Sequence, residues 1–223
     1  MFRHRTTQGL DAYVSQHEII KVYDNLAPLY DLWGSLTETK ARRRAMELAS
    51  VIDGSVVLEV AVGTGLTFRE LVKQNPHGKN FGIDISAGML EKAKDRLNKV
   101  ESGAYRLELG SAFKLDAADN SVDILMNNYM FDLIAFKDMP AILAEFRRVL
   151  KHDGHLILVN MTRGESRLSA VYEWIYRLSP KLMGGCRGVN LSGQLTDSGF
   201  IVDKREYIQQ MLFPSEVILA RPG

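Results

Sequence analysis

Residues 56–65 have the sequence Val56-Val57-Leu58-Glu59-Val60-Ala61-Val62-Gly63-Thr64-Gly65, and this stretch decides how the rest of the chain is interpreted. It begins with an apolar, β-branched run, which is typical of a strand buried on both faces. Two glycines one residue apart follow, and the apolar spacing becomes helical from Leu66 onward. A strand, a glycine turn and a helix open a doubly wound α/β sheet, where ligands bind beyond the carboxyl ends of the strands. The stretch therefore predicts an α/β fold with a ligand site at the turn.

The residues around this turn indicate the kind of ligand. A dinucleotide-binding turn has a third glycine, but Phe68 stands at that position here. No Gly-Lys-Ser/Thr sequence follows the turn, so the sequence lacks a phosphate-binding P-loop at this point. A carboxylate near the end of a buried strand, here Glu59, is costly unless a cation or a hydrogen-bond donor meets it. The ammonium group of an amino acid would do so, which favours a ligand with a nucleoside at one end and an amino acid at the other.

The segment Glu59–Gly65 resembles motif I of the class I S-adenosylmethionine-dependent methyltransferases. The resemblance continues in order through Phe81-Gly82-Ile83-Asp84-Ile85-Ser86, Asn120-Ser121-Val122-Asp123-Ile124-Leu125 and Arg147-Arg148-Val149-Leu150-Lys151-His152-Asp153-Gly154. It implies a doubly wound, mostly parallel seven-stranded sheet with an antiparallel C-terminal hairpin and N-terminal lid helices. It also implies that S-adenosylmethionine is the cofactor.

Two further segments are expected to contact this cofactor. Asp84 follows a short apolar run, nineteen residues after Gly65, near the spacing at which a carboxylate meets ribose hydroxyls; Ser86 is the better N-cap for the next helix. The family commonly has an aspartate where Ser111 stands, so the adenine contact is weaker here and shared with the backbone of Ala112. The full predicted cofactor site consists of Tyr23, Tyr30, Glu59, Ala61, Gly63, Thr64, Gly65, Asp84, Ile85, Met89, Ser111, Ala112, Asn127 and Asn128.

Aromatic segments near both sides of the core indicate a covered site. Residues 23–31 resemble the N-terminal lid of the ubiquinone/menaquinone C-methyltransferases and phosphatidylethanolamine N-methyltransferases. The resemblance implies that Tyr23 or Tyr30 closes over the cofactor, and simple helix packing is the alternative. Residues 165–179 are rich in aromatic and aliphatic side chains. They form either an apolar wall over an acceptor pocket or ordinary core.

The end of the predicted fourth strand, residues 122–128, carries the candidate catalytic groups. Asn128 and Tyr129 follow or end this strand, at the edge that faces both cofactor and acceptor. Either side chain could position the acceptor, and Asp132 could act as a base; hydrogen bonding at the strand end is the alternative. No cluster of His, Cys and carboxylate residues has metal-ligand spacing, so no metal is predicted.

The remaining pattern predicts how the domain is organised. The length suits one domain over residues 1–223, with an N-terminal arm and lid helices in residues 1–50. The cofactor-binding core is expected in residues 51–223, with a cap segment near 163–190. Apolar spacing up to Leu150 predicts a helix before the turn at Asp153-Gly154, and His155–Asn160 is then the fifth strand.

Composition limits the partners and the compartment. A formal charge of +1 gives no reason to expect nucleic acid. Cys186 is the single cysteine, which fits a reducing compartment, and the sequence shows neither a signal-peptide pattern nor an apolar run of membrane-spanning length. We therefore expect a cytoplasmic protein. Residues 40–44, Lys-Ala-Arg-Arg-Arg, form either a solvated helix face or a peripheral contact with anionic lipid headgroups. The oligomeric state is left open.

The sequence thus predicts an enzyme that transfers a methyl group from S-adenosylmethionine to a hydrophobic small molecule, either a quinone-ring precursor or a phospholipid headgroup. Methylation of a soluble metabolite or a small thiol is the alternative within the same enzyme class. A cofactor-binding partner protein without turnover is a second alternative, for which the departure at Ser111 is the only hint. A nicotinamide-dependent oxidoreductase is disfavoured by Phe68.

Overall fold

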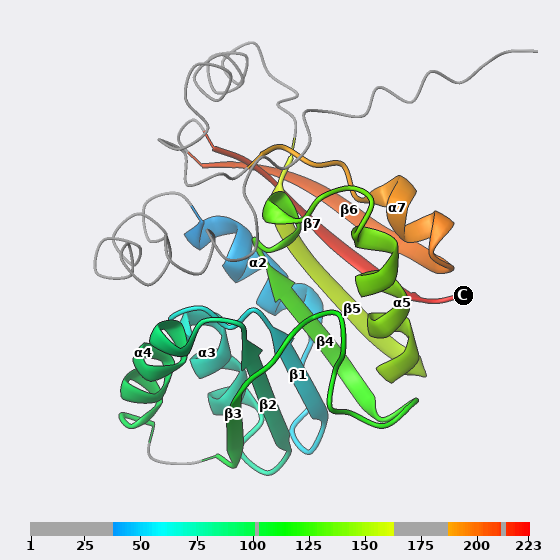
Figure 1. Cartoon of the computed structure of the whole chain (residues 1–223). Helices are drawn as coiled ribbons and strands as arrows, with labels where there is room; N and C mark the ends of the chain where they lie inside the picture. The colour runs from blue at the N-terminus through cyan, green and yellow to red at the C-terminus, as the bar shows by residue number, and fades with distance from the viewer. Residues whose placement is uncertain (1–37, 101–102, 163–186, 211–212) are drawn as a thin grey trace, which may run out of the picture.

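The fold is built on one seven-stranded sheet (Figure 1). The computed structural model describes residues 38–100, 103–162, 187–210 and 213–223. The strands are β1 (Val56–Val60), β2 (Lys79–Asp84), β3 (Tyr105–Leu109), β4 (Val122–Asn128), β5 (Leu150–Met161), β6 (Phe200–Gln210) and β7 (Phe213–Pro222). Their order is β3-β2-β1-β4-β5-β7-β6, with β1 to β5 parallel and β7 antiparallel to both β5 and β6. The predicted mostly parallel sheet with a C-terminal hairpin is confirmed.

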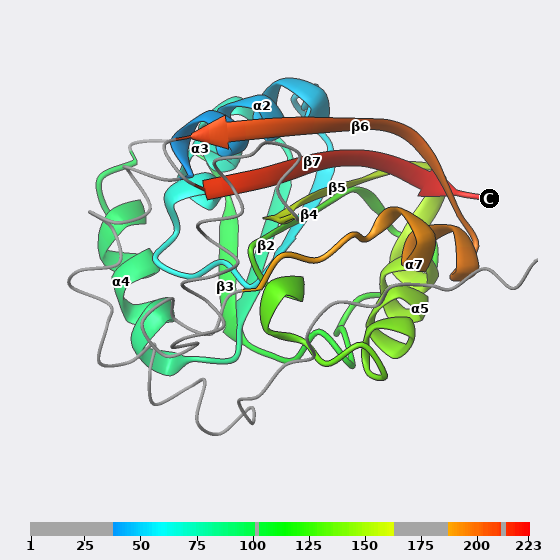
Figure 2. The same cartoon turned by 90° about the horizontal axis from the view of Figure 1, so that it is seen from above.

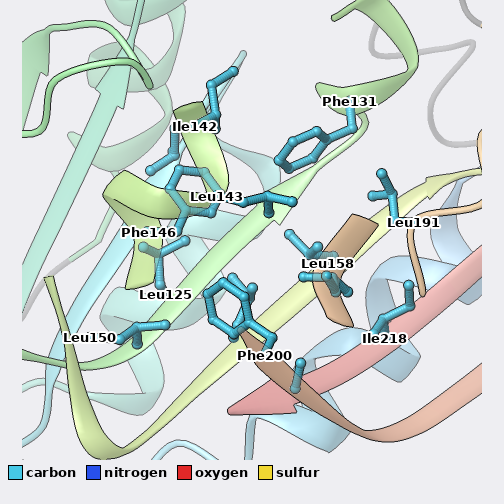
Figure 3. Close-up of a cluster of buried hydrophobic side chains, with 14 of the residues drawn as sticks. Leu125, Phe131, Ile142, Leu143, Phe146, Leu150, Leu158, Leu191, Phe200 and Ile218 are labelled. Carbon is cyan, nitrogen blue, oxygen red and sulfur yellow. The ribbon is translucent and has the colours of Figure 1, made fainter. Parts of the chain in front are cut away.

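Helices cover both faces of the sheet, which gives three layers (Figure 2). One face carries α2 (Thr39–Ala49), α3 (Leu66–Gln74) and α4 (Ala87–Leu97); the other carries α5 (Met139–Val149) and α7 (Ser192–Asp197). A short 3-10 helix, η1 (Phe131–Leu133), follows β4. Between α5, α7 and the sheet lies a core that includes Leu125, Phe131, Phe146, Leu158 and Phe200 (Figure 3). The predicted lid residues 23–31 and the aromatic segment 165–179 lie outside the described residues.

The glycine turn after β1 has the shape that its sequence predicts. Gly65 begins α3 with φ +79°, a left-handed conformation that glycine adopts without steric cost. A Cβ on Gly65 would lie 3.0 Å from both Cα and Cβ of Ala93 in α4. The missing side chain therefore lets the start of α3 pack directly on α4.

Phe68 of α3 stands where a dinucleotide-binding turn has its third glycine. The space for its ring comes instead from the neighbouring strand β2. Its ring is fully buried and packs edge-on against Tyr105, with the ring centroids 6.4 Å apart. A Cβ on Gly82 of β2 would lie 3.1 Å from the Phe68 ring, 2.7 Å from Leu107 and 2.8 Å from Val62. Gly82 thus provides the space for close packing that a third glycine in the turn would otherwise provide.

The start of the fifth strand differs from the sequence prediction. The helix ends at Val149, and Leu150 is already extended and paired with Val122 of β4. His155 pairs with Ile124, so the residues between Leu150 and His155 form an irregularity in the ladder. Gly154 permits it, because a Cβ there would lie 3.0 Å from the Val122 carbonyl oxygen. The prediction that the strand begins at His155 was wrong, since pairing with β4 extends it.

We predict that Gly82→Ala lowers the free energy of unfolding by about 1–3 kcal/mol, because the added methyl group overpacks the contact of Phe68, Leu107 and Val62. Urea denaturation of both proteins measures this change. Gly193→Ala in α7 is the matched control, since a methyl group added at Gly193 would meet open space and alanine favours a helix. Equal losses in the two variants would contradict this account of Gly82.

Candidate functional site

A cavity opens at the carboxyl ends of β1, β2 and β4, where the sequence places the ligand site. Its walls come from four consecutive turns, and they bring together eight of the predicted cofactor residues: Ala61, Gly63, Asp84, Ile85, Met89, Ser111, Ala112 and Asn128. Four others, Glu59, Thr64, Gly65 and Asn127, lie in the same turn or strand ends but do not line the cavity. Tyr23 and Tyr30 lie outside the described residues.

Asp84 connects the first two turns of this site. One carboxylate oxygen accepts a hydrogen bond from the backbone N–H of Gly63 at 2.7 Å, and the other accepts from the N–H of Ser86 at 2.9 Å. Ser86 in turn caps α4 by accepting from the Met89 N–H, as predicted. Among the described residues no atom lies within 4 Å of a Cβ position at Gly63, so the backbone is open to a ligand there. Asp84 therefore holds the glycine turn while facing the cavity.

Glu59 is buried at the end of β1 with its charge poorly compensated. It is 1% exposed, and Oε1 accepts a hydrogen bond from Nδ2 of Asn128 at 3.0 Å. Oε2 has no hydrogen-bond partner among the described residues. Burial raises the pKa of Glu59 to about 8, and the Asn128 hydrogen bond and Arg42 lower it only in part. A cation placed beside Oε2 would restore the ionised form, so the site fits a ligand with an ammonium group.

The segments that follow β2 and β3 together form an apolar wall. Ile85, Met89, Ala112 and Phe113 contribute side chains to it. The Ser111 hydroxyl accepts a hydrogen bond from the Phe113 N–H at 3.3 Å, which leaves it able to donate to a ring nitrogen. This wall suits the flat face of an aromatic base.

The three candidate catalytic residues have different positions. Asn128 and Tyr129 line the cavity, whereas Asp132 on η1 is fully buried and does not. The Tyr129 hydroxyl shares a 2.9 Å hydrogen bond with Ser215, and burial raises its pKa. Tyr129 also has φ +53°, a left-handed conformation that is costly for a bulky residue and occurs mainly at functional sites.

Asp132 is a carboxyl group without strong partners. Neither oxygen makes a hydrogen bond of good geometry to the rest of the described chain. Burial raises its pKa to about 8; the backbone N–H groups of Asp132 and Met161 lower it in part, and Glu38 raises it further. Asp132 is therefore predominantly protonated at neutral pH.

Two charged residues near Asp132 were not singled out from the sequence. Arg187 is 2% exposed and donates to the backbone carbonyls of Asp132 and Ile134. Its guanidinium lies 4.6 Å from the centre of the Phe136 ring. Glu38 is ion-paired with Arg42, and burial raises its pKa to about 7. No local pattern identifies Arg187, because its carbonyl partners lie 53 to 55 residues away in sequence.

The basic run of α2 is only partly available to a membrane. Arg42 pairs with Glu38, and Arg44 pairs with Glu206 at 2.7 Å. Lys40 and Arg43 remain exposed. Among the described helices none is long and apolar enough to span a membrane. Within the same residues no group of three or more potential metal ligands occurs.

Comparison with known proteins gives the site its context. Residues 57–154 match a family described as a methyltransferase domain. A demethylmenaquinone methyltransferase of Thermotoga maritima is 34% identical over 146 residues, which are 64% of this chain and 61% of that protein. The chain is similar to class I S-adenosylmethionine-dependent methyltransferases. This agrees with the resemblance seen in the sequence, and S-adenosylmethionine is the cofactor that the comparisons indicate.

Solved structures share the fold of this chain. A putative methyltransferase in complex with the Haloferax volcanii Trm112 activator has a TM-score of 0.74 at 18% identity, covering 92% of this chain and 97% of that chain. The [4+2]-cyclase SpnF has a TM-score of 0.75 at 16% identity, covering 96% of this chain and 98% of that chain. The chain spans 61–64% of the length of the first curated relatives that it matches.

The buried state of Asp132 makes the stability depend on pH. A carboxyl with a folded pKa of about 8 and an unfolded pKa near ~3.9 binds a proton only in the folded chain between these values. Its contribution to stability therefore falls as pH rises through this window. We predict that Asp132→Asn removes roughly 1.4 kcal/mol per pH unit from the slope of unfolding free energy between about pH 5 and 7.

Urea denaturation at a series of pH values measures these slopes. Asp95→Asn, on the exposed side of α4, is the control variant and is expected to keep the wild-type slope. Parallel curves for wild type and Asp132→Asn would show that Asp132 is ionised in the folded protein.

Proposed function

We propose that this protein transfers the methyl group of S-adenosylmethionine to a hydrophobic small molecule, with a quinone-ring precursor as the favoured class. The observation that carries the proposal is the pair of acidic side chains at adjacent strand ends. Oε2 of Glu59 has no hydrogen-bond partner in the part of the chain that the structure describes, and Asp84 lies beside the open Gly63. The pair matches a ligand that carries an ammonium group and a ribose. The similarity to demethylmenaquinone methyltransferases supports the acceptor class.

The cavity and the strand ends beside it would hold the cofactor as follows. Glu59 receives the ammonium group, and the carboxylate of Asp84 accepts the ribose hydroxyls. The wall with Ser111 and Ala112 takes the adenine ring, with Met89 and Ile85 on the same apolar wall. Thr64, Gly65 and Asn127 shape the strand ends around the amino-acid portion. The Asn127 amide does so by donating to the Val60 carbonyl at 2.8 Å.

The protein would promote methyl transfer mainly by positioning the cofactor and the acceptor. The bound cofactor supplies an electrophilic methyl group with a good leaving group. The protein orients the acceptor and excludes water, and good orientation of two reactants recovers roughly 7–11 kcal/mol of barrier. We assign Asn128 and Tyr129 to the acceptor wall. Asp132 serves as the proton acceptor or as a neutral hydrogen-bond donor, since a pKa near the working pH suits both tasks.

The surroundings of the catalytic end favour an apolar acceptor. Met130, Leu133 and Ile134 line this side of the cavity. Burial raises the pKa of Asp132 to about 8, so this carboxyl carries little negative charge near neutral pH. A quinol ring gains from both features, because its ring is apolar and its hydroxyl must lose a proton. A phospholipid headgroup is the second option, and the exposed Lys40 and Arg43 would face the lipid surface.

A protein that binds the cofactor without transferring its methyl group is the second candidate function. The resemblance of the fold to a [4+2]-cyclase supports it, because the fold alone does not decide the reaction. Methylation of a soluble metabolite or a small thiol remains the alternative within the methyltransferases.

We predict that the protein transfers labelled methyl from S-adenosylmethionine into the organic phase of a total cell extract. The phases are separated and counted, and Asp84→Ala, which loses the ribose contact, is expected to reduce transfer at limiting cofactor at least ~10-fold, or ~1.4 kcal/mol. Glu91→Ala on exposed α4 is the control. Label confined to the aqueous phase would contradict the hydrophobic acceptor, and tight cofactor binding without any transfer would favour the second candidate.

A further inference from the structure

The segment that forms the adenine wall has no helix of its own. Residues 110–121 connect β3 to β4, whereas α3, α4 and α5 lie within the other three connections between parallel strands. Within this segment the structure shows a bridge between Ser111 and Lys114 and no longer element. Its first four residues, 110–113, line the cofactor cavity. The shape of the adenine wall must therefore be fixed from outside the segment.

Space also lies on the other side of the same segment. A groove between it and the exposed faces of β1, β2 and β3 is lined by Leu115, Ala117 and Ser121, together with Phe81 of β2. Residues 115–121 therefore do not pack tightly on the sheet. Leu115 is the buried apolar side chain of this stretch, at 5% exposed. One leucine supplies burial but no directional bond, so it does not by itself fix the backbone.

Directional bonds come from two residues of α5. Arg148 donates from Nη1 to the Ala117 carbonyl at 2.8 Å and from Nη2 to the Leu115 carbonyl at 3.0 Å. Glu145 accepts from the Leu115 N–H through Oε1 at 2.8 Å. Three backbone groups of the segment are therefore bound by two neighbouring side chains of one helix.

These two side chains also hold each other in place. Arg148 Nε donates to Glu145 Oε2 at 2.8 Å, and Nη2 donates to Oε1 at 2.7 Å, which is a two-point contact. Arg148 further pairs with Asp119 at 2.6 Å. The planar guanidinium is required for this arrangement, because a lysine ammonium cannot form the two parallel bonds. The Arg148 side chain lowers the pKa of Glu145, so the pair stays ionised.

We propose that Glu145 and Arg148 are positioning residues that set the affinity for the adenosine part of the cofactor. They do so by holding residues 110–117 in the conformation that forms the adenine wall, although neither residue lines the cavity. The proposal rests on the placement of adenine beside Ser111 that the proposed function includes. The proposal gives a role in cofactor binding to α5, a helix that packs against β5 and lines no part of the cavity.

The test compares Arg148→Lys and Glu145→Gln with wild type in two measurements. Calorimetric titration with adenosine and with S-adenosylhomocysteine is expected to show Kd values at least tenfold higher in both variants. Hydrogen exchange of the ligand-free protein is expected to be faster in residues 112–118, including the Leu115 amide that Glu145 binds. The double variant should lose little more than each single one, because the two residues act as one unit.

Arg147→Lys is the matched control, because Arg147 lies on the same helix and donates to the Gly223 carbonyl, away from the segment. It is expected to keep wild-type Kd and wild-type exchange. Faster exchange with adenosine affinity within twofold of wild type would overturn the proposal, as would a lower thermal stability with both other readouts unchanged. If wild type binds neither ligand, the proposed function fails with it; if wild type binds and the variants bind equally well, only the positioning role fails.

Discussion

Buried carboxylates at the carboxyl ends of two adjacent strands are the constraint on which the site depends. Glu59 is the penultimate residue of β1 and Asp84 is the last residue of β2, and the parallel register brings both to the same edge of the sheet. The two side chains differ in how their burial is compensated. Asp84 is stabilised by the N–H groups of Gly63 and Ser86, whereas Glu59 has one amide partner and a raised pKa. A cationic ligand group beside Glu59 would offset the remaining desolvation cost of its ionised form.

The rest of the molecule supports these two positions. Gly65 lets α3 pack on α4, and Gly82 leaves room for Phe68 beneath the turn. On the other face, the core beneath α5 fixes the helix from which Glu145 and Arg148 hold the segment after β3. Around η1 the chain instead keeps Asp132 protonated near neutral pH, with Arg187 bound to backbone carbonyls. The ionised Glu145–Arg148 pair thus supports the cofactor side, whereas the neutral Asp132 lies at the acceptor end.

Local patterns predicted what local chemistry controls. The strand and glycine turn at 56–65, the Ser86 cap and the place of Asp84 at the end of β2 follow from short stretches, and the structure confirms these positions. The start of β5 at Leu150 could not be predicted in this way, because pairing with Val122 decides it. Arg187 and the Glu145–Arg148 pair were missed for the same reason: their partners lie 29 to 55 residues away in sequence.

The central claim is that Glu59 receives the ammonium group of the cofactor, and calorimetry at pH 6.5 in buffers of different ionisation enthalpy tests it directly. Glu59 has a pKa of about 8 in the ligand-free protein, so it is protonated at this pH. An ammonium group beside it lowers that pKa, and the account predicts net proton release when S-adenosylmethionine binds wild type. Glu59→Gln should bind at least ~10-fold more weakly, by ~1.4 kcal/mol, with no such release. Equal affinity and equal proton release in both proteins would contradict the claim.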